Sequence, residues 1–451
     1  MANRLPFYRP QPGGDAWCKS PGGLVSALTP ILQAEGGSWI GWDGNPGRAP
    51  EPFEQDGIRS VPIALSQKEI DSFYKGFANR TLWPLYHDAV RRPHFEQRWW
   101  KPYVDVNRRF AECAAGEAAP GGVVWVQDYH LQLVPAMLRQ LRPDLRIGFF
   151  LHIPFPPQEL FAQLPWRKPI LEGILGADFF ACHTALGASN FAQLAVRYAG
   201  AEAVDGVNAL RFDGRTVRFG ALPISIDVQQ FERVANSHAA RERAASIRRE
   251  LGDRKILLGV DRLDYTKGID IRLRAYGTLL DRGALSPDQC VLVQTVVPSR
   301  SDVLEYMRVR DKVEQLVGSI NGRHGSLGRV AVHYLHQNLE LDELVPLYLA
   351  ADVMLVTPLR DGMNLVCKEY VATRTDGGGV LVLSEFTGAA YELTEALLIN
   401  PYDQEALARS ILQALEMPPE EAARRMGALR RTVETHDVYQ WAHEFLSALA
   451  A

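Results

Sequence analysis

Short apolar runs alternate with longer amphipathic stretches over most of this chain, and the pattern predicts strands joined by helices. Val123–Val126, Ile147–Leu151 and Asp178–Ala181 predict strands, with a helix from about Leu131 to Leu141 between the first two. Beyond Leu222-Pro223-Ile224, which predicts a linker, strands are expected at Ile256–Val260, Val291–Val296, Val330–Tyr334, Val353–Val356, Val380–Leu383 and Leu397–Ile399. Such alternation is typical of parallel strands with crossover helices. The sequence therefore predicts two doubly wound α/β domains of similar size, with a cleft between them.

One stretch, residues 351–370, combines a buried strand with a polar turn and a helix start. Pro358 ends the strand because it has no N–H for a sheet ladder. Arg360-Asp361-Gly362 predicts a turn, and the unpaired N–H groups of a helix starting near Met363 favour an anionic ligand. Glu369, about 9 Å along that helix, could accept hydrogen bonds from a ribose diol. An ordinary crossover with solvated charges is the alternative.

A loop after the first strand of the second half carries two cations. Arg262 and Lys267 lie five residues apart in DRLDYTKG, which opens a helix, and they suit a pyrophosphate leaving group. Ser299-Arg300, also past a strand end, adds another candidate phosphate anchor. Surface cations in a loop are the alternative, but the recurrence of cations at strand ends favours a functional site.

Polar side chains also follow two strands of the first half. Asp128-Tyr129-His130 and His152 fall at predicted strand ends, where ligands of such sheets bind. A histidine there can equally be a structural hydrogen-bonding residue. Gly22 and Gly23 precede a predicted helix and would let backbone approach a ligand closely.

Aromatic residues gather in the first 83 positions. At least one of Trp39 and Trp42 is expected in the core. A helix with a capping box at Ser66 and Glu69 carries Tyr74, and Trp83 follows it. These two are core residues or a wall on which a sugar ring stacks.

Composition limits the classes of function. A formal charge of -4 over 451 residues argues against nucleic acid as the main partner. The five cysteines show no metal-type spacing and predict free thiols in a reducing compartment. No apolar run approaches the roughly 18 residues of a membrane span, and no signal peptide is visible, so we expect a soluble, cytoplasmic protein.

Eight segments in order along the chain resemble the trehalose-6-phosphate synthases, retaining nucleotide-sugar glycosyltransferases with two Rossmann-like domains facing a cleft (the GT-B fold). They are NRLP (3–6), SPGGLV (20–25), GWDG (41–44), DYHL (128–131), FFLHIPFP (149–156), RLDYTKG (262–268), SRSDV (299–303) and TPLRDGMNLVCKEYVA (357–372). The resemblance implies an acceptor-binding domain over residues 1–222 and a nucleotide-sugar-binding domain over 223–436. A final helix, 437–451, would pack back on the first domain.

The resemblance implies roles residue by residue. Arg262 and Lys267 would hold the donor diphosphate, Glu369 the ribose, and Asp361 with His152 the hydroxyls of the transferred glucose. Gly22 would let the amino-terminal loop close over the donor. The full implied donor site consists of Gly22, Gly23, His152, Arg262, Lys267, Asp361, Met363, Asn364, Leu365, Val366 and Glu369.

The implied acceptor site consists of Arg4, Trp42, Tyr74, Trp83, Asp128 and Arg300. Arg4, Tyr74 and Arg300 would clamp the acceptor's phosphate. Trp42, preferred to Trp39 because of the GWDG match, and Trp83 would line the sugar pocket. Asp128 would contact sugar hydroxyls at the reaction centre, so the implied catalytic residues are Arg262, Lys267, Asp128, His152 and Asp361.

The chain departs from the family pattern in places. The family usually has an apolar strand before NRLP, whereas only Met1 and Ala2 precede it here. Without that strand, Arg4 would be held less firmly. Gln127 stands where many relatives have His, and Cys367 where Ala is common. Both substitutions look tolerable.

The resemblance implies transfer of glucose from a nucleoside diphosphate to glucose 6-phosphate, giving α,α-trehalose 6-phosphate. No metal, no cofactor and no partner beyond these small molecules is expected. A glucosylglycerol-phosphate synthase and a non-catalytic, sugar-phosphate-sensing relative are the alternatives. The sequence leaves open which nucleotide the donor carries and the oligomeric state, with a homo-oligomer as one alternative.

Overall fold

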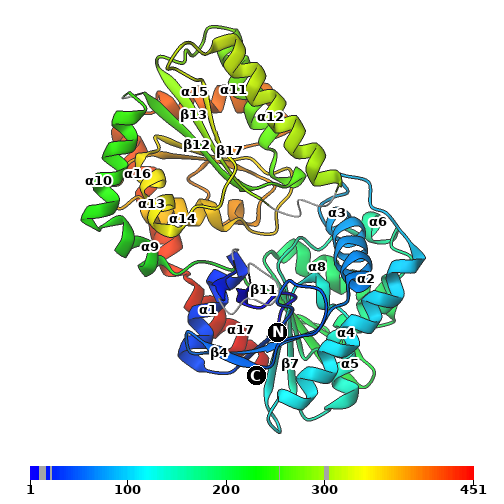
Figure 1. The fold of residues 1–451 in the computed structure, drawn as a ribbon. Coiled ribbons are helices and arrows are strands. Elements are labelled where there is room, and N and C mark those ends of the chain that lie inside the picture. Colours follow the sequence, from blue (N-terminus) through cyan, green and yellow to red (C-terminus); the bar gives the residue numbers. More distant parts are fainter. Residues whose placement is uncertain (10–16, 21–22, 253, 299–303) are drawn as a thin grey trace. The chain divides into compact units, whose positions relative to one another are not determined.

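The chain forms two units in the computed structural model, which describes residues 1–9, 17–20, 23–252, 254–298 and 304–451 (Figure 1). Unit 1 comprises Met1–Ile224 and Val438–Ala451, and unit 2 comprises Ser225–Asp437. Both termini therefore belong to unit 1.

A six-stranded parallel sheet forms the centre of unit 2. Its strands, in spatial order, are β14 (Val332–Leu335), β13 (Cys290–Val297), β12 (Lys255–Arg262), β15 (Val353–Val356), β16 (Val380–Ser384) and β17 (Leu397–Ile399). Counted along the chain this is the order 3-2-1-4-5-6, that of dinucleotide-binding folds, with the order reversing between β12 and β15. All six predicted strands are confirmed, with small differences at their ends. The strands are mostly apolar because helices cover both faces of a parallel sheet, and polar residues such as Asp261 and Arg262 lie towards their carboxyl ends.

Helices lie on both faces of this sheet (Figure 1). One layer holds helices that contact one another in series, α9 (Val228–Ala235), α10 (His238–Glu250), α13 (Leu341–Ala350), α14 (Leu365–Thr373) and α16 (Pro419–Thr435). The other holds α11 (Ile269–Asp281), α12 (Leu304–His324) and α15 (Gln404–Leu415). Short 3₁₀ turns follow β12 and β16, namely η4 (Tyr265–Lys267) and η5 (Gly388–Tyr391).

A second six-stranded sheet forms the centre of unit 1. Its order is β6 (Val123–Gln127), β7 (Arg146–Leu151), β8 (Phe179–Cys182), β11 (Arg215–Ala221), β10 (Ala209–Phe212) and β9 (Glu202–Ala203). β6, β7, β8 and β11 are parallel, and the sheet ends in an antiparallel hairpin extension that the sequence pattern did not predict. The helix predicted from Leu131 begins at Val134, after a 3₁₀ turn.

The remaining elements of unit 1 flank this sheet. A three-stranded sheet, in the order β3 (Ser38–Gly41), β5 (Ile58–Pro62), β4 (Phe53–Gln55), and a short pair, β1 (Phe7–Tyr8) with β2 (Cys18–Lys19), precede it in the chain. The carboxy-terminal helix α17 (Val438–Ala450) contacts β7, β8 and α1. The other helices are α1 (Gly23–Glu35), α2 (Gln67–Glu69), α3 (Trp83–Tyr86), α4 (Gln97–Glu117), η2 (Tyr129–Leu131), α5 (Val134–Leu141), α6 (Gln158–Phe161), α7 (Arg167–Ile174), α8 (Ala185–Leu194) and η3 (Ala195–Ala199).

The helix that carries Tyr74 has an unusual form. Ser66 and Glu69 make the predicted capping box, but only Gln67–Glu69 is α-helical, and Ile70–Leu82 (η1) is a π-helix. π-helical turns are rare and concentrate at functional sites. Gly76 fits this packing, since a Cβ there would lie 2.7 Å from the Trp99 ring.

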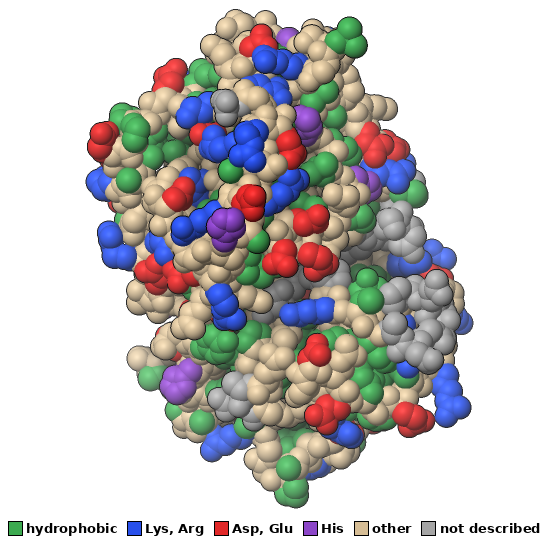
Figure 2. All heavy atoms as spheres, turned by 60° about the vertical axis from the view of Figure 1, so that its left-hand side comes forward, with side chains coloured by type: hydrophobic (Ala, Val, Ile, Leu, Met, Phe, Trp, Pro, Cys, Tyr) green, Lys and Arg blue, Asp and Glu red, His purple; other side chains and the backbone are tan. Residues whose placement is uncertain are grey.

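The charged surface is mixed. On the face where α10 lies, Lys and Arg side chains are interspersed with Asp and Glu (Figure 2). None of the helices within the described ranges is long and apolar enough to cross a membrane.

Candidate active site

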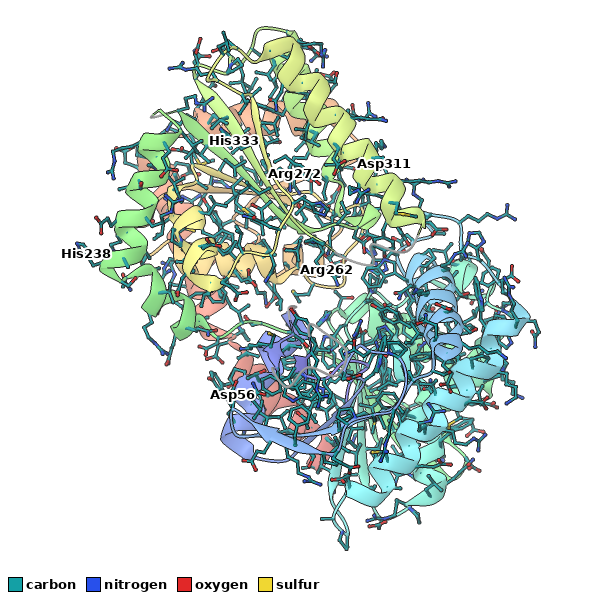
Figure 3. The ribbon with its side chains drawn as sticks, in the orientation of Figure 1. Asp56, His238, Arg262, Arg272, Asp311 and His333 are labelled. Atoms are coloured by element: carbon teal, nitrogen blue, oxygen red, sulfur yellow. The ribbon has the colours of Figure 1, made fainter. Side chains whose placement is uncertain are left out.

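The loop that follows β12 carries two of the predicted donor-site cations. Arg262 is the last residue of β12 and is exposed (Figure 3), whereas Lys267 ends the η4 turn and is buried. Gly268 follows with φ +63°, and a Cβ there would lie 2.2 Å from the Thr357 carbonyl oxygen. Glycine at this position therefore lets the loops after β12 and β15 approach each other.

The loop that follows β15 carries the complementary acidic residue. Asp361 Oδ2 accepts hydrogen bonds from Lys267 Nζ at 2.5 Å and from Asn364 Nδ2 at 3.1 Å. Asn364 has φ 108° and caps α14 by accepting the Cys367 N–H at 3.1 Å. Positive φ is uncommon for a residue other than glycine, and such strain clusters at functional sites.

These two loops meet at the point where the strand order of unit 2 reverses, between β12 and β15. Leu359 N donates to Thr266 O at 2.7 Å, which ties one loop to the other. The predicted residues Met363, Leu365 and Val366 surround the start of α14, whose first N–H groups have no partner within the helix. The structure thus brings Arg262, Lys267 and Asp361 to the place where doubly wound folds bind their ligands.

A buried cation that was not predicted from the sequence connects the strands that carry these two loops. Arg272 of α11 is fully buried in the interior of unit 2 (Figure 3). Its guanidinium donates to Asp261 Oδ2 at 2.7 Å, Gln294 Oε1 at 3.0 Å and Thr357 Oγ1 at 3.1 Å. Asp261 and Thr357 lie at the carboxyl ends of β12 and β15, and Gln294 lies within β13, so one side chain joins three neighbouring strands. Gly259 makes room, because a Cβ there would lie 2.0 Å from Arg272 Nη1.

Glu369 lies one turn beyond Leu365 on α14 and is half-buried. Its Oε2 accepts a hydrogen bond from the Tyr348 hydroxyl at 2.9 Å. Burial raises the pKa of Glu369 to about 7, although the Tyr348 hydrogen bond acts to lower it. Because Glu369 is only half-buried, the hydroxyls of a ligand can replace water as hydrogen-bond donors to its carboxylate.

Unit 1 brings together Arg4, Trp42 and Tyr74 of the predicted acceptor site. The Arg4 guanidinium carbon lies 4.1 Å from the centre of the Trp42 ring and 5.5 Å from that of Tyr74. Tyr74 stacks in turn on His130, with ring centres 5.8 Å apart and planes inclined by 16°. Trp83 lies nearby in the chain but is buried, with its ring 5.6 Å from that of Tyr129.

The GWDG segment is explained by this arrangement. A Cβ on Gly44, whose φ is +100°, would lie 2.1 Å from Arg4 Nη1, and one on Gly41 would lie 2.7 Å from the Arg4 carbonyl carbon. Trp39 and Trp42 are both buried. Trp39 Nε1 donates to Arg4 O at 2.9 Å, and the Trp42 ring faces the Arg4 guanidinium.

Arg4 is held firmly, contrary to the expectation from the short segment that precedes it. Ala2 N donates to Ile40 O at 3.0 Å and Leu5 N to Trp42 O at 2.9 Å. On the other side, Gln127 N donates to Met1 O at 3.0 Å. These bonds reach from β3 to β6, so the first residues bridge the two sheets.

Asp128 and His152 come together at the carboxyl ends of β6 and β7. Asp128 Oδ1 accepts the His152 backbone N–H at 3.1 Å. Asp128 has φ 72° and ψ 170°, a region essentially restricted to glycine. Because so unfavourable a conformation persists only where the surrounding structure imposes it, the fold fixes the position of Asp128 at the strand end.

His152 is held as a neutral imidazole. Burial, followed by the neighbouring His183, lowers its pKa well below the usual value. Its Nε2 is 2.8 Å from Gln127 Oε1, so Gln127 provides a hydrogen-bond partner for the ring. His183, at the end of β8 with its ring centre 5.4 Å from that of His152, was not singled out from the sequence. Its position directly after a third buried strand is the feature of the sequence that could have identified it as a site residue.

Three predicted site residues remain, namely Gly22, Gly23 and Arg300. Gly23 is the first residue of α1. Gly22 and Arg300, with the segment Ser299–Val303, lie outside the described residues. Within the described ranges, no group of three or more His, Cys, Asp or Glu side chains could hold a metal ion.

The arrangement suits two anionic sugar compounds. In unit 2, cations and helix N–H groups converge beside a carboxylate, as a sugar nucleotide requires. In unit 1, the Arg4 guanidinium lies against two aromatic rings, and Asp128 and the neutral His152 meet at strand ends of the same unit. Such groups suit a sugar phosphate.

Known proteins match this chain over nearly its whole length. The model of glycosyltransferase family 20 matches residues 5–451. The trehalose-6-phosphate synthase of Mycolicibacterium vanbaalenii is 55% identical over 467 residues, covering 100% of this chain and 95% of that protein.

Solved structures are similar over almost the whole chain. A UDP-forming α,α-trehalose-phosphate synthase from Burkholderia xenovorans, in complex with glucose-6-phosphate, has a TM-score of 0.91 and 33% identity, covering 96% of this chain and 97% of that one. A protein from E. coli bound with UDP-2-fluoro glucose has a TM-score of 0.90 and 33% identity, covering 99% and 98%. The predicted α/β fold class, GT-B, is confirmed by these matches.

Proposed function

This chain belongs to glycosyltransferase family 20, and from that membership we propose that it transfers glucose from a nucleoside-diphosphate glucose to glucose 6-phosphate, forming α,α-trehalose 6-phosphate. The reaction retains the α configuration of the transferred glucose. One observation carries the proposal: Arg262, Lys267, Asp361 and the start of α14 meet at the strand-order reversal of unit 2.

The donor binds through its diphosphate and its two sugars. Arg262, Lys267 and the N–H groups of Asn364 and Leu365 hold the phosphates, because cations and a helix start complement their charge. Glu369 binds the ribose hydroxyls. Lys267 already donates a hydrogen bond to Asp361 before the donor binds. In the complex, the Lys267 ammonium therefore contacts both the diphosphate and Asp361, and Asp361 also accepts a hydrogen bond from a glucose hydroxyl.

The acceptor binds in unit 1. Arg4 and Tyr74 hold its phosphate, and the buried Trp42 and Trp83 form the wall behind its sugar. Asp128 and the neutral His152 face sugar hydroxyls at the reaction centre, where a neutral imidazole can donate or accept a hydrogen bond without adding charge.

Transfer with retention follows from same-face attack. The acceptor's anomeric hydroxyl attacks the glucose C1 on the side from which the diphosphate departs, and its proton passes to the leaving phosphate oxygen. This route needs no carboxylate nucleophile. Asp361 accepts hydrogen bonds from Lys267 and Asn364, and Asp128 accepts one from the His152 backbone N–H, so both can act as hydrogen-bond acceptors. Catalysis consists of positioning and of stabilising the charge that develops on the diphosphate.

This chemistry needs no cofactor, because the protein's own cations meet the leaving group's charge. The five cysteines are all free, which favours a reducing compartment, and we place the enzyme in the cytoplasm on that ground. The Burkholderia xenovorans synthase is UDP-forming and the E. coli protein binds UDP-2-fluoro glucose, and UDP, ADP and GDP are the candidate donor nucleotides of this chain.

The test is a product assay by mass spectrometry on the purified full chain. UDP-, ADP- and GDP-glucose are each combined with glucose 6-phosphate or glycerol 3-phosphate. We predict trehalose 6-phosphate with at least one donor, dependent on glucose 6-phosphate. A product only with glycerol 3-phosphate would identify the glucosylglycerol-phosphate synthase instead. Nucleotide binding without turnover would identify a sensing protein.

A further inference from the structure

Tyr348 is a fully buried tyrosine whose hydroxyl contacts a carboxylate of the donor site. It lies on α13 with 0% of its surface exposed, and the hydroxyl donates to Glu369 Oε2 at 2.9 Å. Among the described residues, no other side chain hydrogen-bonds to this carboxylate. Glu369 itself is only half-buried, so a ligand can reach it.

We propose that Tyr348 is a positioning residue for the nucleotide: by holding Glu369 Oε2, it orients the carboxylate so that the acid recognises the hydroxyls of a ribose. The inference rests on the proposed function, because it takes Glu369 to bind the sugar of a nucleoside diphosphate. Tyr348 never touches the substrate. It acts through the carboxylate.

The surroundings of Tyr348 leave its ring little freedom. The ring packs edge-to-face on Tyr370 of α14, with centres 6.1 Å apart. Arg374, just past the end of α14, donates to the carbonyl oxygens of Tyr348 and Leu349 at 3.3 Å each. Its own guanidinium is held by Asp376 at 2.9 Å. The helices α13 and α14 are thus fixed to each other on both sides of the Tyr348–Glu369 bond.

Electrostatics makes the direction of the bond definite. Burial, followed by the charge of Glu369, raises the pKa of Tyr348 well above its usual value, so the hydroxyl keeps its proton and donates. Burial raises the pKa of Glu369 to about 7, and the Tyr348 hydrogen bond opposes that rise. A hydrogen bond to the charged form favours the charged form, which accepts hydrogen bonds from hydroxyls most strongly.

A purely structural hydrogen bond would affect stability and nothing else. A positioning role predicts a selective defect, because only ligands that carry ribose hydroxyls use Glu369. Diphosphate contacts come from the loops after β12 and β15 and do not involve Tyr348. The two roles therefore separate in the affinity for nucleotides with and without those hydroxyls.

The experiment measures binding of UDP, ADP and GDP, and of their 2′,3′-dideoxy counterparts, by calorimetry on the full chain. For the nucleotides that bind the wild type, we predict that Tyr348→Phe weakens the ribonucleotide about tenfold, the loss expected for one hydrogen bond to a charged group. The dideoxy nucleotide should change by less than about twofold, a difference below the worth of one hydrogen bond. In turnover, the donor KM should rise with a smaller change in kcat.

Tyr276→Phe is the matched control. Tyr276 of α11 is also fully buried in unit 2, and its hydroxyl donates to Cys290 O at 3.0 Å, at the amino end of β13. The Tyr276→Phe variant also loses one buried tyrosine hydroxyl, but at the amino ends of the strands, whereas the donor site lies at their carboxyl ends. Its nucleotide affinity should therefore stay at the wild-type value.

A double-mutant cycle with Glu369→Gln completes the test, and the effect of Tyr348→Phe should disappear in that background. Equal loss for ribo- and dideoxy nucleotides, or no loss at all, would overturn the inference while leaving the proposed function standing. If no nucleoside diphosphate binds the wild type, the proposed function fails first. Should Tyr348→Phe not fold, Glu369→Asp draws the carboxylate away from Tyr348 with its charge kept, and the same selective loss is expected.

Discussion

Replacing Asp128 with glycine and with alanine separates the strain in its backbone from the function of its carboxylate. At φ 72° and ψ 170°, a residue with a Cβ costs about 1–3 kcal/mol. Both variants lose the side-chain hydrogen bond to the His152 N–H, worth about 1 kcal/mol, so that loss cancels in their comparison. Glycine relieves the strain but adds about 0.5–1 kcal/mol of unfolded-chain entropy. We therefore expect the glycine variant to be more stable than the alanine variant by about 1 kcal/mol.

Chemical denaturation and trehalose 6-phosphate formation are the two assays. Both variants should lose acceptor-dependent turnover to a similar extent, because neither has the carboxylate that the proposed mechanism places against the sugar hydroxyls. Glu54 in the exposed middle of β4 is the control, since glycine in a strand should there be less stable than alanine by about 0.5–1 kcal/mol. Equal stability of the two Asp128 variants would refute the strain, and an active glycine variant would refute the role of the carboxylate.

Three further changes test the donor site. Arg262→Ala should lower kcat about 10²–10³-fold, as for removal of one group that stabilises developing charge, and should leave the thermal unfolding temperature unchanged because Arg262 is exposed. Gly268→Ala should destabilise the protein by more than about 1 kcal/mol in urea denaturation, because the new Cβ meets the Thr357 carbonyl at 2.2 Å. With the pKa of Glu369 at about 7, nucleotide affinity should rise roughly tenfold from pH 6 to pH 8 as the acid ionises, a rise that calorimetry should find reduced in Glu369→Gln.

The arrangement of unit 2 was predictable because its strands are short, mostly apolar runs, and longer helical stretches separate all of them but β16 and β17, which a 3₁₀ turn joins. Val353–Val356 and Leu397–Ile399 match their predicted bounds for this reason. The sheet β3-β5-β4 has short strands of mixed burial, such as Phe53–Gln55, and leaves no comparable period in the sequence. The capping box at Ser66 predicted a helix, but the capping signal does not distinguish an α-helix from the π-helix that follows.

The candidate site shows the same limit. The cations and carboxylates at strand ends could be found because position in a doubly wound sheet indicates function. The buried charge of Arg272 could not, since its helix position looks like any other surface arginine until Gly259 is seen to make room for it. The backbone conformations of Asp128 and Asn364 are set by tertiary contacts and leave no local signal for residues of this type.

The central claim is that this chain joins two glucose units through their anomeric carbons with retention. The most direct measurement is two-dimensional NMR of the product formed from donor glucose labelled with ¹³C at C1 and unlabelled glucose 6-phosphate. We predict a single phosphorylated disaccharide with an α,α-1,1 linkage and the label in the unphosphorylated ring. A β configuration at the labelled carbon, or a linkage to any other hydroxyl of glucose 6-phosphate, would contradict it.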